Sequence, residues 1–151
     1  MALVMKQVTD GKKCYLDLLL LADEQESMVD RYLGRGEMFI FVDGDVVVGE
    51  CVVTDEGAGV CELKNIAVRP GCQRRGFGRE MIEMLSGHYA GRYETMIVGT
   101  GDVPSTVGFY KKCGFEYSHR IPGFFTDNYD HPIIEDGILL CDMVCFRRPI
   151  P

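Results

Sequence analysis

The spacing of hydrophobic and polar residues changes several times along the chain. Residues 12 to 22 and 77 to 90 carry apolar residues every three or four positions, which is typical of amphipathic helices. Residues 38 to 42 and 46 to 53 are rich in β-branched and aromatic residues, and Asp43-Gly44-Asp45 between them predicts a hairpin. Read in the same way, the whole pattern predicts strands at 2–8, 38–42, 46–53, 60–69, 95–100, 115–120 and near 138–146, and helices at 12–22, 23–33, 77–90 and 104–112.

The order of these elements predicts the fold class. Three consecutive strands between residues 38 and 69 favour an antiparallel meander, and helices then interrupt the strands without strict alternation. We therefore expect an α+β fold in which helices flank a mixed, mostly antiparallel central sheet. No repeat, linker or low-complexity tract divides the sequence, so residues 1–151 are expected to form a single domain.

The net charge limits the kinds of partner that the protein is expected to bind. Lys and Arg number 16 against 23 Asp and Glu, a formal net charge of -7, which disfavours binding to nucleic acid or to an anionic membrane surface. The longest apolar stretch, residues 18 to 22, is far shorter than the roughly 20 residues of a membrane span, and no signal peptide is apparent. Seven cysteines without a C-x-x-C pair favour reduced thiols and a cytoplasmic location over a disulfide framework or a metal site.

A turn rich in glycine and arginine joins the strand that ends at Arg69 to the helix that begins at Phe77. Gly76 and Gly78 allow the backbone to approach a ligand closely, and the first N–H groups of a helix have no partner within it. Together with three neighbouring arginines, these donors predict a cradle for a pyrophosphate. A dinucleotide fingerprint and a Walker loop are both excluded, because the third glycine and the Lys-Ser/Thr pair that they require are absent. The alternative is an ordinary surface turn with solvated arginines.

Two strings in this part of the chain resemble the GNAT superfamily of N-acyltransferases. Gln73-Arg74-Arg75-Gly76-Phe77-Gly78 is similar to that family's Q/R-x-x-G-x-G/A loop, which holds the pyrophosphate of acyl-CoA. Further along, Phe109-Tyr110-Lys111-Lys112-Cys113-Gly114-Phe115 is similar to the family's Y-x-K-x-G-F pattern. The resemblance covers roughly residues 37 to 120. The chain departs from it at Val103, where many relatives have an asparagine that contacts the pantetheine arm.

The resemblance implies acetyl-CoA as the acetyl donor. The pyrophosphate would lie on the backbone amides of residues 73 to 79, and the thioester arm would follow residues 66 to 68, where the strand splays from the next one. The residues that the resemblance assigns to the donor are Ile66, Ala67, Val68, Gln73, Arg74, Arg75, Gly76, Phe77, Gly78 and Arg79.

Tyr110 is the candidate proton donor. An amine must lose a proton before it attacks a thioester, and the departing thiolate benefits from an acid. Tyr110 matches the tyrosine that has this role in the GNAT family. A phenol with a pKa of about 10 is a suitable acid for a thiolate whose own pKa is about 8.5 or higher. The alternative for Tyr110 is a core aromatic residue on a short helix.

Glu62 is the candidate base, acting through a water molecule. It stands eleven residues before Gln73, the same distance as the catalytic glutamate in the histone-acetylating branch of the family. Because strand side chains alternate, we expect it to share a face with Lys64, Ile66 and Val68. The other interpretation is a strand-face carboxylate paired with Lys64. Glu50, one strand earlier, is a weaker substitute.

Residues outside the two motifs suggest the acceptor. The segment from Pro122 to Gly137 is long for a connection within a domain, and such segments are often functional. Phe124, Phe125 and Tyr129 are its candidate acceptor-binding residues, for a cationic molecule; alternatively they pack beneath the sheet. Residues 23 to 26, Asp-Glu-Gln-Glu, lie where the family's acceptor cleft is expected and add negative charge.

These observations predict an acetyl-CoA-dependent N-acetyltransferase that acts on the primary amine of a small, cationic molecule by direct attack in a ternary complex. The alternatives are a CoA-binding sensor or scaffold without catalysis, an acetyltransferase for a protein amine, and a nucleotide phosphate-binding protein. Cys72 and Cys113 lie near the motifs and offer a ping-pong route, although neither has an evident base nearby. No metal ion is expected. The last strand can pair with that of a second chain to form a homodimer, as in many relatives.

Overall fold

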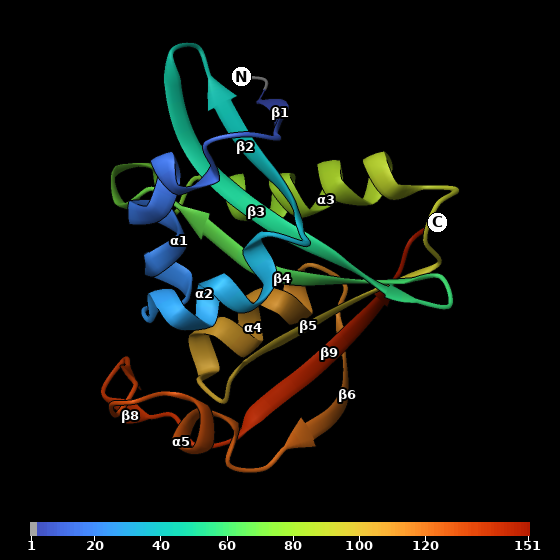
Figure 1. Cartoon of the computed structure of the whole chain (residues 1–151). Helices are drawn as coiled ribbons and strands as arrows, with labels where there is room; N and C mark the ends of the chain where they lie inside the picture. Colours follow the sequence, from blue (N-terminus) through green and yellow to red (C-terminus); the bar gives the residue numbers. More distant parts are fainter. Residues whose placement is uncertain (1–2) are drawn as a thin grey trace.

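The computed structural model describes residues 3–151, which form a seven-stranded sheet with helices on both faces and a separate two-stranded hairpin (Figure 1). The helices are α1 (Leu16–Ala22), α2 (Glu26–Leu33), α3 (Phe77–Tyr89), α4 (Pro104–Lys112) and α5 (Phe124–Asn128), with short 3-10 turns at Lys12–Tyr15 and Pro70–Cys72. The strands are β1 (Val4–Val8), β2 (Glu37–Asp43), β3 (Val46–Gly57), β4 (Val60–Val68), β5 (Thr95–Gly101), β6 (Glu116–Ile121), β7 (Ile134–Glu135), β8 (Ile138–Leu139) and β9 (Met143–Pro149).

The sheet is mixed and mostly antiparallel. Its strand order is β1-β2-β3-β4-β5-β9-β6, and β4 with β5 is the one parallel pair within the described residues. Strand β9 returns between β5 and β6 and pairs antiparallel with both. The expectation that this last strand pairs with that of a second chain was wrong, because both of its edges are already paired within the sheet. The predicted α+β fold, with a mixed, mostly antiparallel sheet flanked by helices, is therefore confirmed.

The parallel strands β4 and β5 pair over only part of their length. Their register runs from Val60 opposite Thr95 to Leu63 opposite Val98, and beyond these residues the two strands diverge. From Lys64 to Val68, the edge of β4 that faces β5 consequently has no partner strand among residues 3–151. This is the splay that the family resemblance implies, and it opens the sheet between its two faces.

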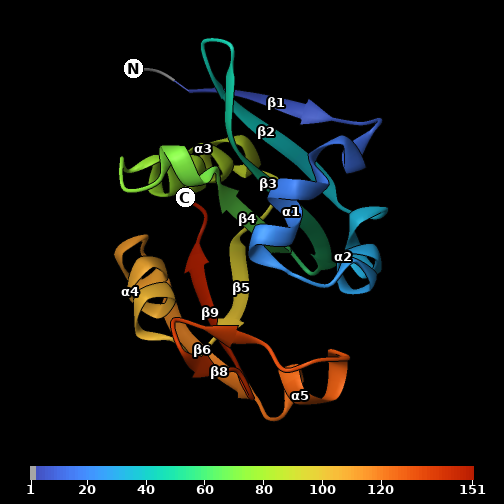
Figure 2. The same cartoon turned by 90° about the vertical axis from the view of Figure 1, so that its left-hand side faces the viewer.

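The helices lie on opposite faces of the sheet (Figure 2). On one face, Met81 and Leu85 of α3 and Tyr110 of α4 belong to the main hydrophobic core. On the other face, Leu19 of α1 and Val29 of α2 form a second buried cluster with β2 and β3. The opening between β4 and β5 therefore connects the α3–α4 layer with the α1–α2 layer.

The C-terminal part differs from the prediction. Residues 122–137 were expected to be a connection without regular structure, but they contain α5 and β7, and the last strand is Met143–Pro149 rather than 138–146. Helix α5 has five residues and β7 and β8 have two each, so none is long enough to show a helical or strand period. Residue 2 of the predicted first strand lies outside the described residues.

Three structural findings concern membrane spans, metal sites and cysteines. No helix in residues 3–151 is long and apolar enough to cross a membrane. The same stretch of chain holds no group of three or more His, Cys, Asp or Glu side chains that could bind a metal ion. All seven cysteines are free thiols, and five of them are buried.

Candidate functional site

The loop before α3 has a backbone shaped to bind an anion. Arg74 has a φ of 64° and Gly76 a φ of 79°, so both adopt the left-handed conformation. Left-handed residues between ordinary ones turn successive N–H groups toward one point. Gly76 also caps α3, whose first N–H groups have no side-chain cap and whose dipole is positive at this end. The loop therefore has left-handed residues and uncapped N–H groups at the place where the sequence predicts a pyrophosphate cradle.

A cavity of about 600 Å³, here called the α3–α4 cavity, opens beside this loop. Two of the predicted donor-binding residues do not line it. Ala67 alternates with its neighbours and points to the other face of β4, and Arg75 is exposed, with its guanidinium 5.9 Å from the centre of the Phe77 ring. The residues that line the cavity are Ile66, Val68, Cys72, Gln73, Arg74, Gly76, Phe77, Gly78, Arg79, Ser105, Thr106, Phe109, Tyr110, Lys112 and Cys113.

The two glycines of the motif serve different purposes. A Cβ atom on Gly78 would lie 3.0 Å from two carbons of the Phe109 ring, which is too close without a shift of that ring. A Cβ atom on Gly76 would meet nothing within 4 Å, so position 76 needs glycine only for its positive φ. Gly76 therefore bends the loop, whereas Gly78 lets α4 pack closely against α3.

Strand β4 contains a β-bulge at Lys64. In its pairing with β3, Leu63 lies opposite Val53 and Asn65 lies opposite Val52, so Lys64 has no opposite residue. An extra residue of this kind breaks the regular alternation of side chains along a strand. The side chains before and after Lys64 therefore do not alternate in one continuous pattern between the two faces of the sheet.

The bulge corrects the predicted position of Glu62. Leu63, before the bulge, packs in the main core on the α3–α4 face, and so do Ile66 and Val68 after it. Glu62 precedes Leu63 directly and therefore lies on the opposite face of the sheet. The expectation that Glu62 shares a face with Ile66 and Val68 was wrong, because alternation predicts faces only along a strand without a bulge.

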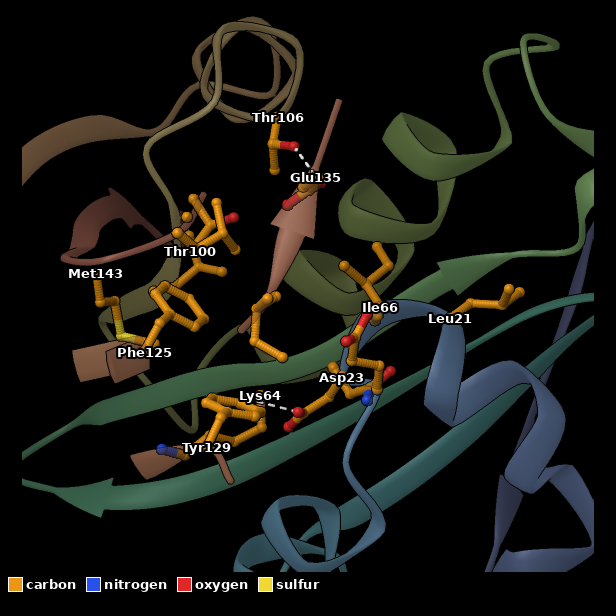
Figure 3. A pocket seen from close by; sticks show the side chains of 18 of the residues that line it. Leu21, Asp23, Lys64, Ile66, Thr100, Thr106, Phe125, Tyr129, Glu135 and Met143 are labelled. Atoms are coloured by element: carbon orange, nitrogen blue, oxygen red, sulfur yellow. Dashed lines mark hydrogen bonds between the residues drawn. The ribbon is translucent and has the colours of Figure 1, made fainter. Parts of the chain in front are cut away.

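A second cavity, of about 390 Å³, lies where β4 and β5 diverge (Figure 3). The end of α1, the two strands, α4 and the C-terminal segment contribute to this β4–β5 cavity. Ile66, Thr106 and Tyr110 line both this cavity and the α3–α4 cavity. The two cavities therefore meet at these three side chains.

Tyr110 stands at this junction with its hydroxyl unused by the protein. Its side chain is 7% exposed, and its ring packs edge-on against Phe109 and Phe115, with centroids 5.2 and 5.6 Å away. Its hydroxyl makes no hydrogen bond to a described side chain. Burial raises the pKa of the phenol above its ordinary value, so the hydroxyl keeps its proton at neutral pH. Tyr110 thus offers a neutral O–H group where the cavities meet.

Asp23, at the end of α1, lines the β4–β5 cavity and is held by tyrosines from two other parts of the chain. The hydroxyl of Tyr129 donates to its Oδ1 at 2.6 Å, and the hydroxyl of Tyr32 donates to its Oδ2 at 2.9 Å. Asn65 in turn donates from Nδ2 to the Tyr32 oxygen at 3.1 Å. Burial raises the pKa of Asp23, while the two tyrosine hydrogen bonds lower it. The carboxylate is therefore oriented in the cavity and only partly hydrated.

Glu62 lines neither of the two cavities that meet at Tyr110. It lines a neighbouring cavity of about 290 Å³, and its carboxylate forms an ion pair of 3.1 Å with Lys64. Lys64 lines both this neighbouring cavity and the β4–β5 cavity. Lys64 thus lies between Glu62 and the β4–β5 cavity.

Helix α5 and the residue after it place an aromatic cluster beside the β4–β5 cavity. Phe125 and Tyr129 line that cavity with stacked rings, 5.6 Å apart at 26°, whereas Phe124 lines the neighbouring one. Val103, at the position where the family resemblance leads us to expect asparagine, is fully buried under this segment. It belongs to one cluster with Phe125, Ile133 and Leu140.

Polar contacts join the end of α5 and the residues after it to α2 and the residues just before it. Arg31 donates to the side-chain oxygen of Asn128 at 3.1 Å, and the backbone N–H of Asp130 donates to Gln25 at 2.9 Å. A ring nitrogen of His131 lies 2.8 Å from a carboxylate oxygen of Glu24. Segments about 100 residues apart therefore share one side of the β4–β5 cavity.

Sequence reasoning missed a pair of residues that line the β4–β5 cavity. The hydroxyl of Thr106 donates to Oε1 of Glu135 at 3.0 Å, the contact drawn at the top of Figure 3. These residues are 29 positions apart and belong to no common motif. The one available signal was the unusual length of the segment from Pro122 to Gly137.

The chain is similar to known acetyltransferases in sequence and in structure. Residues 34–117 match the model of the acetyltransferase (GNAT) domain. The uncharacterized N-acetyltransferase YvbK of Bacillus subtilis (strain 168) is 36% identical over 130 residues, which cover 85% of this chain and 84% of that protein. A GNAT family acetyltransferase from Elizabethkingia anophelis, crystallised with acetyl-CoA bound, has a TM-score of 0.91 and 30% identity, with 97% of each chain covered. A Bacillus subtilis acetyltransferase in complex with CoA has a TM-score of 0.89 and 32% identity, covering 99% of this chain and all of that one (100%). The chain therefore belongs to the GNAT family of N-acetyltransferases.

Proposed function

We propose that the protein transfers the acetyl group of acetyl-CoA to the primary amine of a small, cationic acceptor by direct attack in a ternary complex. The observation that carries this proposal is the junction of two cavities at Ile66, Thr106 and Tyr110. A donor in the α3–α4 cavity and an amine in the β4–β5 cavity would meet there, beside a neutral phenol.

The α3–α4 cavity suits an acyl-CoA in charge and in backbone geometry. The left-handed backbone at Arg74 and Gly76 would turn N–H groups of the loop toward the pyrophosphate, and Arg74, Arg79 and Lys112 add positive charge. The unpaired edge of β4 from Lys64 to Val68 can form hydrogen bonds with the amides of the pantetheine arm. The Elizabethkingia anophelis relative has acetyl-CoA bound, which supports the same donor here.

The reaction replaces a C–S bond with a C–N bond and needs three proton transfers. A base takes a proton from the ammonium group, and the neutral nitrogen attacks the thioester carbon. As the C–N bond forms and the C–S bond breaks, Tyr110 gives its proton to the departing sulfur and regains one from the nitrogen of the new amide. Burial raises the pKa of Tyr110, and the same burial raises the basicity of a thiolate released beside it. Transfer between them is therefore not opposed by the apolar surroundings.

Two cysteines offer a route through an acetyl-cysteine, and their positions argue against it. Cys72 and Cys113 line the α3–α4 cavity, but neither lines the β4–β5 cavity proposed for the amine. Burial raises the pKa of Cys113, so its sulfur is held as a thiol and is a poor nucleophile. These positions favour direct attack over a ping-pong reaction.

The β4–β5 cavity favours an acceptor that combines a positive charge with an apolar part. Asp23 supplies a carboxylate, and Phe125 and Tyr129 supply ring faces for cation–π contact. Leu21 and Ile134 also line it and are 53% and 62% exposed, which leaves apolar surface at its edge. A volume of about 390 Å³ matches a small molecule.

Glu62 remains a candidate for the base. It lies on the same face of the sheet as Asn65, toward the α1–α2 layer, with Lys64 between it and the β4–β5 cavity. A proton from an amine in that cavity would therefore reach Glu62 only through water.

The thiols support a reducing, cytoplasmic location. Cys14 and Cys141 are exposed, and all seven cysteines are free. Exposed thiols persist where glutathione and thioredoxin keep them reduced, so we place the protein in the cytoplasm.

The test of this function is a panel of amines incubated with acetyl-CoA, followed by the release of CoA and by the mass of each amine. The panel contains spermidine, kanamycin, free lysine, benzylamine and a peptide with a free N-terminus. We expect an acetylated product from at least one small cationic amine. Binding of acetyl-CoA without transfer to any amine would instead indicate a sensor or scaffold, and a product from the peptide alone would indicate a protein acetyltransferase. Displacement of CoA by ATP or NAD would indicate a nucleotide site.

A further inference from the structure

The hairpin of β7 and β8 brings a carboxylate to the β4–β5 cavity. Glu135 of β7 lies opposite Ile138 of β8, and Asp136 and Gly137 form the turn with φ values of 50° and 76°. Positive φ at both central residues is the geometry that matches the twist of a two-residue hairpin. Glu135 therefore stands next to a tight turn, and it lines the cavity.

Two side-chain hydrogen bonds attach this hairpin to the first turn of α4. Thr106 donates to Oε1 of Glu135 at 3.0 Å, and Ser105 donates to Oδ2 of Asp136 at 2.5 Å. The residues on either side of the hairpin are buried with the residue before α4, in the cluster of Val103, Phe125, Ile133 and Leu140. Glu135 is thus fixed by a partner that itself lines both cavities.

Three carboxylates line the β4–β5 cavity, and they differ in what their oxygens already bind. Both oxygens of Asp23 accept hydrogen bonds from tyrosines. Glu24 is exposed and is engaged by His131 at 2.8 Å. Glu135 accepts one hydrogen bond, from Thr106, and its Oε2 has no hydrogen bond or ion pair within residues 3–151. Oε2 of Glu24 likewise has no hydrogen bond or ion pair in that stretch, but Glu24 is exposed. Glu135 is half-buried and is held by Thr106, which lines both cavities, so it is the better placed of the two to accept a proton there.

The charge of Glu135 also affects the pKa of Tyr110, the proton donor of the proposed reaction. Its negative charge adds to the rise in the pKa of Tyr110, after the larger contributions of burial and of two cysteines. Tyr110 and Glu135 both line the β4–β5 cavity. The base and the acid that acetyl transfer needs would then face the same cavity.

We infer that Glu135 is the general base that deprotonates the acceptor, an inference that rests on the proposed function. Its free oxygen takes one proton from R–NH3+ and passes it to solvent, and the neutral amine attacks the thioester carbon. The C–N bond forms and the C–S bond breaks, Tyr110 protonates the thiolate, and the nitrogen returns a proton to Tyr110. The products are the acetylated amine, the CoA thiol and one released proton. Thr106 is a positioning residue, which holds Glu135 through Oε1.

The test compares two acceptors of matching shape. Benzylamine is protonated at neutral pH, whereas the terminal nitrogen of phenylhydrazine is largely neutral there. Because a base is needed only for the first, Glu135→Gln should lower kcat with benzylamine by roughly 10²-fold and with phenylhydrazine by less than about threefold. The Kd of acetyl-CoA should not change, which reports that the variant is folded.

Two further variants distinguish the loss of the base from a change in the structure of the hairpin. Asp136→Asn loosens the hairpin without removing a carboxylate from the cavity, so it should slow both acceptors by the same factor. Glu62→Gln tests the other candidate base. Equal slowing of both acceptors by Glu135→Gln, or a selective loss with benzylamine in Glu62→Gln, would overturn the assignment of Glu135.

A pH profile makes the test independent of these two amines. With the best alkylamine of the panel, the rate of Glu135→Gln should rise toward the pKa of the amine more steeply than that of the wild type, because the variant relies on amine that is already neutral. Profiles of the same shape would count against Glu135. A wild-type protein that acetylates no amine at all would contradict the proposed function itself.

Discussion

Tyr129 donates a hydrogen bond of 2.6 Å to Asp23, a residue 106 positions earlier in the chain. The bond joins the end of α5 to the end of α1, while Tyr32 of α2 holds the other carboxylate oxygen at 2.9 Å. Burial raises the pKa of Asp23, because a partly buried carboxylate loses hydration. An ammonium group beside Asp23 would compensate for that loss. We therefore expect Asp23 to give the β4–β5 cavity its preference for a cation.

Asp23→Asn should weaken the binding of cationic amines. Asparagine keeps the shape of the side chain but removes a charge-assisted hydrogen bond, worth roughly 1.5–3 kcal/mol, so KM should rise about 10- to 100-fold. The KM of the best cationic amine measures the effect on the acceptor. The Kd of acetyl-CoA, determined by calorimetry, measures the effect on the donor. The matched control is Glu24→Gln, an exposed carboxylate at the same cavity, which should change KM by less than about threefold. Equal effects of the two variants would argue against the role of Asp23.

Tyr110→Phe should lower kcat by roughly 10²-fold and leave the affinity for acetyl-CoA nearly intact. Phenylalanine fills the same space, and the lost hydroxyl makes no hydrogen bond to a described side chain. The substitution should therefore leave the stability of the fold nearly unchanged. The control is Tyr93→Phe, a buried tyrosine that lines neither cavity, whose kcat should match the wild type. Turnover of Tyr110→Phe at the wild-type rate would remove Tyr110 from the mechanism.

Gly78→Ala should push the Phe109 ring away from α3 and distort the α3–α4 cavity. The new Cβ atom would lie 3.0 Å from the ring, and overpacking of this kind costs about 1–3 kcal/mol. We expect a lower melting temperature and a higher Kd for acetyl-CoA. Adding Phe109→Leu should recover part of both losses, because the smaller side chain makes room. A double variant whose losses are simply the sum of the single ones would show that the two residues are not coupled.

The buried carboxyl of Glu50 should make the stability of the protein depend on pH. It is fully buried in β3, neither carboxylate oxygen has a hydrogen-bond partner among the described residues, and burial holds its pKa well above the ordinary value. Below the unfolded-state pKa of about 4.3, the carboxyl is protonated in both states. As the pH rises further, the unfolded chain releases this proton first, and the free energy of unfolding falls by up to about 1.4 kcal/mol per pH unit.

Glu50→Gln has no proton to release, so the melting temperature of the variant minus that of the wild type should increase between about pH 5 and pH 8. Thermal denaturation over this range measures the difference. Glu116→Gln, on the exposed strand β6, provides the matched control and should show a constant difference. A difference for Glu50→Gln that does not change with pH would mean that Glu50 is not an uncompensated buried carboxyl.

The parts of the fold that local sequence determines were predicted. Helices α2 and α3 and the strands of the meander have enough residues for their periods to show, and the Asp43-Gly44-Asp45 turn was visible as a hairpin signal. The loop before α3 could be singled out because its left-handed backbone coincides with a short string of glycines and arginines. Tyr110 was found from the family resemblance and lies at the junction of the two cavities.

The parts of the site that depend on tertiary contacts were not predicted. The bulge at Lys64 arises from the pairing of β4 with β3, and no residue type marks it in the sequence. It moved Glu62 to the other face of the sheet. The contact between Thr106 and Glu135 joins two elements 29 residues apart, one of which is a strand of only two residues. Such a pair becomes visible only when the chain is folded.

The central claim is that donor and acceptor react directly where the two cavities meet at Tyr110. It is tested most directly by initial rates of acetyl transfer over a matrix of acetyl-CoA and amine concentrations. Direct attack requires both substrates to be bound at once, so the double-reciprocal plots should form lines that intersect. Parallel lines would contradict the account, because they would show that CoA leaves before the amine binds and that the acetyl group passes through the protein.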